Sequence, residues 1–185
     1  MSVSSKLRTL KAGHILRSGH LIAHQTSTLP GIAASALSPI GIKKAQRFKQ
    51  RKGPFLLLAD SVHTALSQAV FLTPALRTLA KQSWPGGVTL VFSARRNLAK
   101  ACYQNGRVAI RVDADVQTRH LAQACGGLML SSSLNRRGKD VLQPSLRLRY
   151  RLHRHLSGVL APQHEPSGQA SKIYKVVGTK VTQLR

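Results

Sequence analysis

Two short polar motifs carry side chains suited to binding a phosphate group. Ser131-Ser132-Ser133-Leu134-Asn135 follows residues 127–130, an apolar run that indicates a buried strand opening after a glycine pair. Hydroxyl and amide groups delivered into a loop there can bond phosphate or sugar oxygens without adding charge. Lys49-Gln50-Arg51 supplies two cations that could face the same anion. Either motif taken alone is more simply explained as an ordinary serine-rich turn or a basic helix end.

Other common chemistries find little support in the residues. The five acidic residues are scattered, which argues against a hydrolase with paired carboxylates, and none of the eight histidines stands in an HExxH zinc motif. The sequence has neither a G-x-x-x-x-G-K loop nor a G-x-G-x-x-G turn. A nucleotide site must therefore be built from side chains, and the set available is Lys49, Arg51, Ser133 and Asn135.

The charge balance points to an anionic partner. The chain has 29 Lys and Arg against 5 Asp and Glu, a net charge of +24. Such self-repulsion is relieved by a polyanion, for which nucleic acid is the first candidate and an anionic membrane the second. The 42% hydrophobic content suffices for a core, and 185 residues suit one α/β domain or a small two-domain protein.

Targeting and redox signals are weak. No apolar run approaches the roughly twenty residues of a membrane span, and there is no secretory h-region. The acid-poor start could imitate an organellar transit peptide, but acid poverty continues through the whole chain. Cys102 and Cys125 lack metal-ligand spacing and are expected to be reduced, structural thiols in a cytoplasmic protein.

The elements that must position the polar motifs alternate between strand and helix. Ser38-Pro39 has the order of a helix start, and Thr73-Pro74 opens another helix. Asp113 or Asp115 can cap a helix through Cys125. Further helices are expected at 4–18 and between 59 and 73, with strands at 20–24, 54–59, 88–92, 108–112, 127–130 and 173–177. Residues 25–31 are expected to form a loop, while 146–156 fit either a strand or, preferably, a helix. This alternation predicts an α/β domain with a mixed sheet.

The order of the motifs resembles the YrdC family of threonylcarbamoyl-AMP synthases. Its hallmark, a KxR motif paired with a distant SxN, is similar to Lys49–Arg51 and Ser133–Asn135, with the turn 84–87 and the strand 108–112 between them. The resemblance is clearest over residues 19–178 and implies one domain over 1–185. It also implies a twisted α/β fold, with a mixed sheet and flanking helices, around a large basic cavity.

The resemblance implies an activity and a role for each matching residue. Family members condense L-threonine, bicarbonate and ATP into threonylcarbamoyl-AMP and pyrophosphate, with Mg²⁺, for threonylcarbamoyladenosine modification of tRNA. ATP binding is implied for Lys49, Arg51, Ser133 and Asn135. Threonine binding is implied for Thr26, Arg111, Ser131 and Ser171. No protein nucleophile and no protein-held metal are implied, because positioning and charge stabilisation suffice.

The chain also departs from the family pattern. Gln25-Thr26-Ser27 stands where the family has Pro-Thr-Glu, and Arg51 runs into Lys52-Gly53 rather than Arg-Pro. The alternative function is a double-stranded RNA or rRNA binder on the same scaffold with weak or no synthase activity. RNA binding through the basic surface is expected in either case. Other tRNA-modification proteins are possible partners, and no membrane association is expected.

Overall fold

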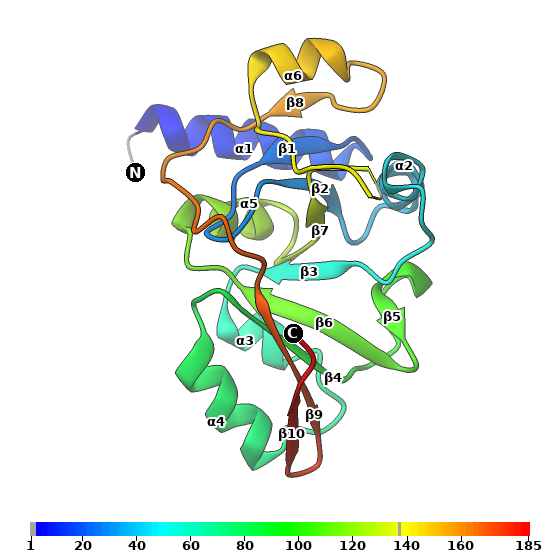
Figure 1. Ribbon diagram of the computed structural model, residues 1–185, viewed down its shortest axis with the longest axis vertical. Helices are drawn as coiled ribbons and strands as arrows, with labels where there is room; N and C mark the ends of the chain where they lie inside the picture. Colours follow the sequence, from blue (N-terminus) through cyan, green and yellow to red (C-terminus); the bar gives the residue numbers. More distant parts are fainter. Residues whose placement is uncertain (1–2, 137) are drawn as a thin grey trace.

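The strands assemble into one mixed sheet (Figure 1). The structure is a computed structural model that describes residues 3–136 and 138–185. Within these residues the strand order is β10-β9-β4-β6-β3-β7-β2-β1-β8, and β5 pairs with β6. The pairs β3–β6, β4–β9 and β1–β8 are parallel and the other neighbours are antiparallel. The strands are β1 Ile22–His24, β2 Gly31–Ser35, β3 Leu56–Ala59, β4 Val88–Ser93, β5 Tyr103–Gln104, β6 Arg107–Val112, β7 Leu128–Ser133, β8 Gly158–Val159, β9 Lys172–Val177 and β10 Lys180–Gln183.

Most helices begin at a side-chain cap that the sequence displays. The side-chain oxygens of Ser38, Thr73 and Asp115 each accept a hydrogen bond from the backbone amide three residues later, satisfying a donor that the helix leaves open. Asp115 rather than Asp113 is thus the cap of its helix. The helices are α1 Val3–Arg17, α2 Pro39–Lys49, α3 Val62–Leu66, α4 Pro74–Ser83, α5 Val116–Ala124 and α6 Leu146–Arg151, with a 3₁₀ turn at Lys100–Cys102.

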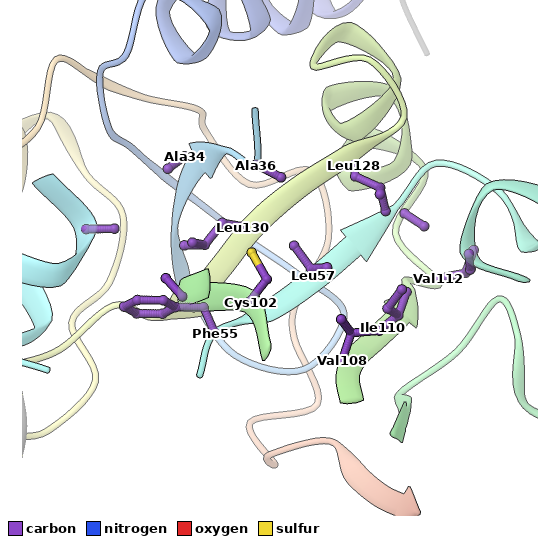
Figure 2. Close-up of a cluster of buried hydrophobic side chains, with 14 of the residues drawn as sticks. Ala34, Ala36, Phe55, Leu57, Cys102, Val108, Ile110, Val112, Leu128 and Leu130 are labelled. Atoms are coloured by element: carbon purple, nitrogen blue, oxygen red, sulfur yellow. The ribbon is translucent and has the colours of Figure 1, made fainter. Parts of the chain in front are cut away.

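The two faces of the sheet bury different side chains. Successive residues of a strand point to opposite faces, so Leu57, Ile110 and Leu130 enter the larger core (Figure 2), which α2, α3 and α4 cover. On the other face Leu58 and Met129 pack against α1 and α5. These two helices contact β2, β3 and β7. The rest of this face, over β4, β6 and β9 and the adjoining ends of β2, β3 and β7, forms one wall of a cavity.

Three predicted boundaries were wrong. The predicted loop 25–31 ends one residue earlier, because Gly31 begins β2, a strand absent from the sequence prediction. The serines 131–133 lie within β7, not in a loop after it, because they pair with β2. The segment 146–156 is helical only to Arg151.

Two further expectations concern the cysteines and the membrane. Cys102 and Cys125 are free and buried, and burial raises the pKa of their thiols to about 11 and about 12. Both therefore pack as small apolar groups. In the described part of the chain, no helix is long and apolar enough to cross a membrane.

Candidate functional site

A cavity of about 390 Å³ opens on the sheet face that α1 and α5 leave uncovered. Among the described residues that line it, four are arginines and none is acidic. The arginines are Arg51, Arg107, Arg111 and Arg185. Hydroxyl groups lie between them, from Thr26, Thr28, Thr89, Ser131, Ser132, Ser133 and Ser171. Cations with many neutral donors and no lining carboxylate favour an anionic ligand.

The strand register explains how distant residues meet in this cavity. Arg107 and Arg111 stand four residues apart on β6, so both point to the cavity face. Leu56 of β3 pairs with Ala109 on one side and with Ser131 on the other. Ser131 is thereby brought onto the same face as the two arginines.

Arg111 is held by an internal carboxylate. Its Nη2 lies 2.6 Å from Asp113 Oδ2, and its Nη1 donates to Thr28 Oγ1 over 2.6 Å. The side chains of Arg111 and Asp113 are 3% and 0% exposed. Burial lowers the pKa of Arg111, and Arg185 lowers it further, whereas Asp113 opposes both effects. Arg111 and Asp113 therefore form a buried ion pair.

The same pair fixes the polar loop 25–30. Asp113 Oδ1 accepts the backbone amide of Ser27 over 2.9 Å. Thr26 Oγ1 donates to the carbonyl of Leu29 over 2.7 Å and lies 3.0 Å from Thr28 Oγ1. Thr26 therefore closes the turn of this loop as well as lining the cavity.

The wall formed by the sheet continues from β6 through β4 to the residues around β9. Ser171 Oγ lies 3.0 Å from Thr89 Oγ1, and both residues are buried. Arg185 Nε donates to the carbonyl oxygen of Ser171 over 3.1 Å. Thr26, Arg111, Ser131 and Ser171, the residues predicted for threonine, all line the one cavity.

The residues predicted for ATP are close together but face different ways. Lys49 Nζ donates to Ser133 O, Asn135 O and Asn135 Oδ1 at 2.7, 2.5 and 2.6 Å. Lys49 is 4% exposed, and burial, with a smaller effect of Arg51, lowers its pKa to about 8. Lys49 does stand at a basic helix end, as the last residue of α2, but these oxygens draw its side chain inward instead of leaving it in solvent. Only Arg51 and Ser133 of the set line the cavity.

Arg51 stands at the cavity beside an aromatic ring. Its guanidinium lies 4.8 Å from the centroid of the Phe55 ring, and its Nη2 donates to Ser132 Oγ over 3.3 Å. Burial lowers the pKa of Arg51. The ring and the hydroxyl hold the guanidinium plane, which favours bidentate contact with an anion.

Sequence reasoning missed several lining residues. Thr28, Thr89, Arg107 and Arg185 belong to the cavity wall. Arg107 could have been found from the alternation along 107–112, which places it on the face of Arg111. The sequence carries no comparable signal for Thr89 or Arg185, because their place depends on the pairing of β4 with β9.

Known proteins resemble this chain in sequence and in fold. The Sua5/YciO/YrdC family model, described as telomere recombination, matches residues 14–185. A threonylcarbamoyl-AMP synthase of Nitrosococcus oceani is 30% identical over 148 residues, which cover 77% of this chain and 78% of the relative. One of Coxiella burnetii is 26% identical, with coverage of 82% and 86%. Relatives with this name are enzymes of the nucleotidyltransferase type.

Two solved structures share the fold. Sua5 of P. abyssi, solved in complex with L-threonine, superposes with a TM-score of 0.86 at 22% identity. The match covers 97% of this chain and 54% of Sua5, so this chain spans about half the length of that protein. YciO of E. coli gives a TM-score of 0.80 at 17% identity, with coverage of 97% and 89%. The predicted family and its fold are confirmed: this chain belongs to the Sua5/YciO/YrdC family.

Proposed function

We propose that this protein is a threonylcarbamoyl-AMP synthase, which makes threonylcarbamoyl-AMP and pyrophosphate from L-threonine, bicarbonate and ATP. The observation that carries the proposal is the composition of one cavity. It unites Arg51 and Ser133 with Thr26, Arg111, Ser131 and Ser171. The curated relatives that bear this name support the same reaction. The product would serve threonylcarbamoyladenosine modification of tRNA.

The chemistry asks for charge stabilisation rather than a protein nucleophile. The threonine nitrogen bonds to the carbon of bicarbonate, and a C–O bond of bicarbonate breaks with release of water. An oxygen of the resulting N-carboxylate then bonds to the α-phosphorus while the bond from that phosphorus to the pyrophosphate oxygen breaks. Negative charge then grows on the leaving pyrophosphate. Arg51 and Arg107 line the cavity where cations would stabilise this charge. Arg111, with Ser131 beside it, would hold the anionic oxygens of threonine.

A magnesium ion fits this site only as a companion of ATP. No carboxylate stands among the described lining residues, and the described residues include no group of three His, Cys, Asp or Glu placed to hold a metal. Mg²⁺ would therefore be held by phosphate oxygens and water and would supply further positive charge there. The expectations of a cytoplasmic enzyme and of protein partners in tRNA modification stay predictions.

The decisive experiment incubates the protein with ATP, L-threonine and labelled bicarbonate. Threonine-dependent release of pyrophosphate and a labelled adenylate are the expected products. Arg51→Met serves as the variant with impaired phosphate binding, and Arg47→Met, an arginine of α2 outside the cavity, serves as its control. Pyrophosphate release that does not respond to threonine or bicarbonate would reject the synthase.

A second candidate function is RNA binding, and α6 supplies the observation that favours it. Arg147, Arg149 and Arg151 are exposed on this helix, and Tyr150 stands among them with 78% of its surface exposed. Arginines attract the phosphate backbone, and an exposed aromatic ring can stack on a base. RNA binding by this surface is compatible with the synthase and would also persist if the enzyme activity were weak.

A further inference from the structure

A buried histidine contacts the wall of the cavity without lining it. His24, at the end of β1, is 1% exposed, and its Nε2 lies 3.3 Å from Ser131 Oγ. Ser131 lines the cavity, whereas His24 lies behind it. Ser131 therefore links His24 to the cavity by direct contact.

A glycine makes this contact possible. β2 lies between β1 and β7, so the two side chains must meet above β2. Gly31 of β2 pairs with His24, and a Cβ atom on Gly31 would lie 3.1 Å from both His24 Nε2 and Ser131 Oγ. Any side chain at Gly31 would crowd both partners. The structure thus keeps open a direct path from the histidine ring to the serine hydroxyl.

The histidine is neutral at physiological pH. Burial lowers its pKa to about 4, while Asp113 and Asp115 oppose this effect and Arg111 adds to it. A neutral imidazole carries one N–H donor and one bare acceptor nitrogen. If Nε2 carries the proton, Ser131 Oγ accepts the hydrogen bond and the serine hydroxyl keeps its own proton for another partner.

We propose that His24 is a positioning residue, which donates from Nε2 to Ser131 Oγ and so directs the Ser131 hydroxyl proton to an anionic oxygen of the amino-acid substrate. Arg111 lines the same cavity and supplies the charge, while Ser131 supplies an oriented neutral donor. This inference rests on the proposed function, because it names how the threonine side of that site is oriented.

The test measures threonine-dependent pyrophosphate release in four forms of the 185-residue chain. The forms are wild type, His24→Phe, Ser131→Ala and the double variant. Each single variant should raise the KM for threonine about tenfold, the size expected from one hydrogen bond to a charged group. The double variant should be no worse than either single one, because both remove the same bond. The KM for ATP should not change.

A rescue variant and a control separate positioning from packing. His24→Gln can place an amide nitrogen near the former Nε2 and should restore the KM for threonine to within about threefold of wild type. His63→Phe replaces an exposed histidine of α3 and should have no effect. Thermal unfolding of every variant identifies any that fails to fold, and the His24→Gln and Ser131→Ala pair then still decides the question.

A spectroscopic measurement detects the hydrogen bond between His24 and Ser131 independently of the enzyme assay. ¹⁵N shifts of the His24 ring should show a proton on Nε2, and Ser131→Ala should shift that signal. A proton on Nδ1, additive effects in the double variant, or a parallel rise in the KM for ATP would overturn the inference. Wild-type protein that never uses threonine would reject the proposed function and this inference with it. A wild type that uses threonine, with His24→Phe equal to it, rejects the inference alone.

Discussion

Lys49 Nζ donates to Asn135 Oδ1 over 2.6 Å, across 86 residues of sequence. Ser133 Oγ donates to the same oxygen over 2.7 Å. The KxR lysine and both polar residues of the SxN motif thus form one hydrogen-bonded cluster, and the arginine of KxR stands outside this cluster and lines the cavity. The two cations of the KxR motif therefore have separable positions: Lys49 joins the end of α2 to the end of β7, whereas Arg51 lines the cavity in which we propose that the ligand binds.

Lys49→Met should destabilise the protein. It removes three hydrogen bonds that a buried cation donates to half-buried oxygens of Ser133 and Asn135. Two of these oxygens keep another donor, because the Asn135 amide donates to Ser133 O and Ser133 Oγ donates to Asn135 Oδ1. Losing a hydrogen bond to a charged group costs about 1.5–3 kcal/mol. Urea unfolding measures the loss. Lys43→Met, at an exposed position of the same helix, is the control. Equal free energies of unfolding in the wild type and Lys49→Met would show that the cluster adds no stability.

Arg51→Met should weaken ATP binding and leave the fold intact. Arg51 is exposed at the cavity rim, so its removal leaves no buried charge behind. One charge-assisted phosphate contact is worth about 1.5–3 kcal/mol, which corresponds to an affinity lower by roughly ten- to a hundredfold. Titration calorimetry with ATP measures it, again beside Arg47→Met. Unchanged affinity would remove Arg51 from the phosphate site.

Arg111 and Asp113 should be coupled in stability. Arg111→Gln leaves the Asp113 carboxylate buried without its cation, and breaking a buried pair in this way costs about 3–5 kcal/mol. Adding Asp113→Asn removes that charge and should recover much of the stability. Denaturant unfolding of both single variants and the double variant gives the coupling energy. Additive effects would mean that the two groups do not depend on each other.

Threonine use provides the second measurement on these variants. The double variant Arg111→Gln/Asp113→Asn should be more stable than Arg111→Gln alone, but it still lacks the guanidinium. It should therefore bind threonine poorly while keeping its affinity for ATP. Thr26→Val should show the same selectivity, because its hydroxyl closes the cavity loop. Threonine dependence of pyrophosphate release decides the point, and an unchanged dependence in both variants would leave Arg111 and Thr26 with a structural task only.

How far the sequence predicts this site depends on whether the signal is local. The caps at Ser38 and Thr73 and the strand at 108–112 follow from local chemistry and were predictable, whereas the cap of α5 was left open between Asp113 and Asp115. β2 was not, because Gly31–Ser35 consists largely of residues with low strand propensity and owes its conformation to pairing with β1 and β7.

The burial of Lys49 could not be predicted from the sequence either. A lysine at a helix end is ordinarily solvated, and here it turns inward only because Ser133 and Asn135 present three oxygens to it. Those oxygens are placed by the end of β7, far away in sequence. The residues of the site could thus be selected from the sequence, whereas their division between scaffold and cavity needed the tertiary structure.

Acid should destabilise the protein through His24. Its pKa falls from 6.5 to about 4 on folding, with burial as the main cause, Asp113 and Asp115 opposing and Arg111 assisting. Between these pH values the unfolded chain binds a proton that the folded chain does not, so the free energy of unfolding decreases as the pH falls. The decrease from this group approaches roughly 3 kcal/mol near pH 4.

His24→Phe isolates that contribution. The difference in unfolding free energy between wild type and variant should depend on pH between 6.5 and about 4 and should be constant above this window. Urea unfolding at several pH values measures it, and His63→Phe is the control for an exposed histidine. If the free energies of unfolding of wild type and His24→Phe depend on pH in the same way, the pKa of His24 is the same in the folded and the unfolded chain.

RNA binding should be separable from ATP binding. Replacing Arg147, Arg149 and Arg151 with glutamine should weaken RNA binding and flatten its salt dependence, by up to roughly one unit of slope for each phosphate that an arginine no longer neutralises. ATP affinity should stay unchanged, because none of the three lines the cavity. A control triple, Arg77→Gln, Lys81→Gln and Arg95→Gln, removes the same charge from exposed positions elsewhere.

Tyr150→Ser tests whether α6 meets bases as well as phosphates. The ring is 78% exposed, and stacking on one base is worth about 1–3 kcal/mol, so single-stranded RNA should bind more weakly with an unchanged salt slope. Double-stranded RNA, whose bases remain stacked on each other, should respond little. Filter binding of both RNAs at several salt concentrations, beside ATP titration, gives the answer. If the triple variant of α6 and the control triple variant weaken RNA binding equally, the effect comes from net charge alone and not from a surface on α6. If the triple variant of α6 also lowers ATP affinity, α6 lies at the nucleotide site.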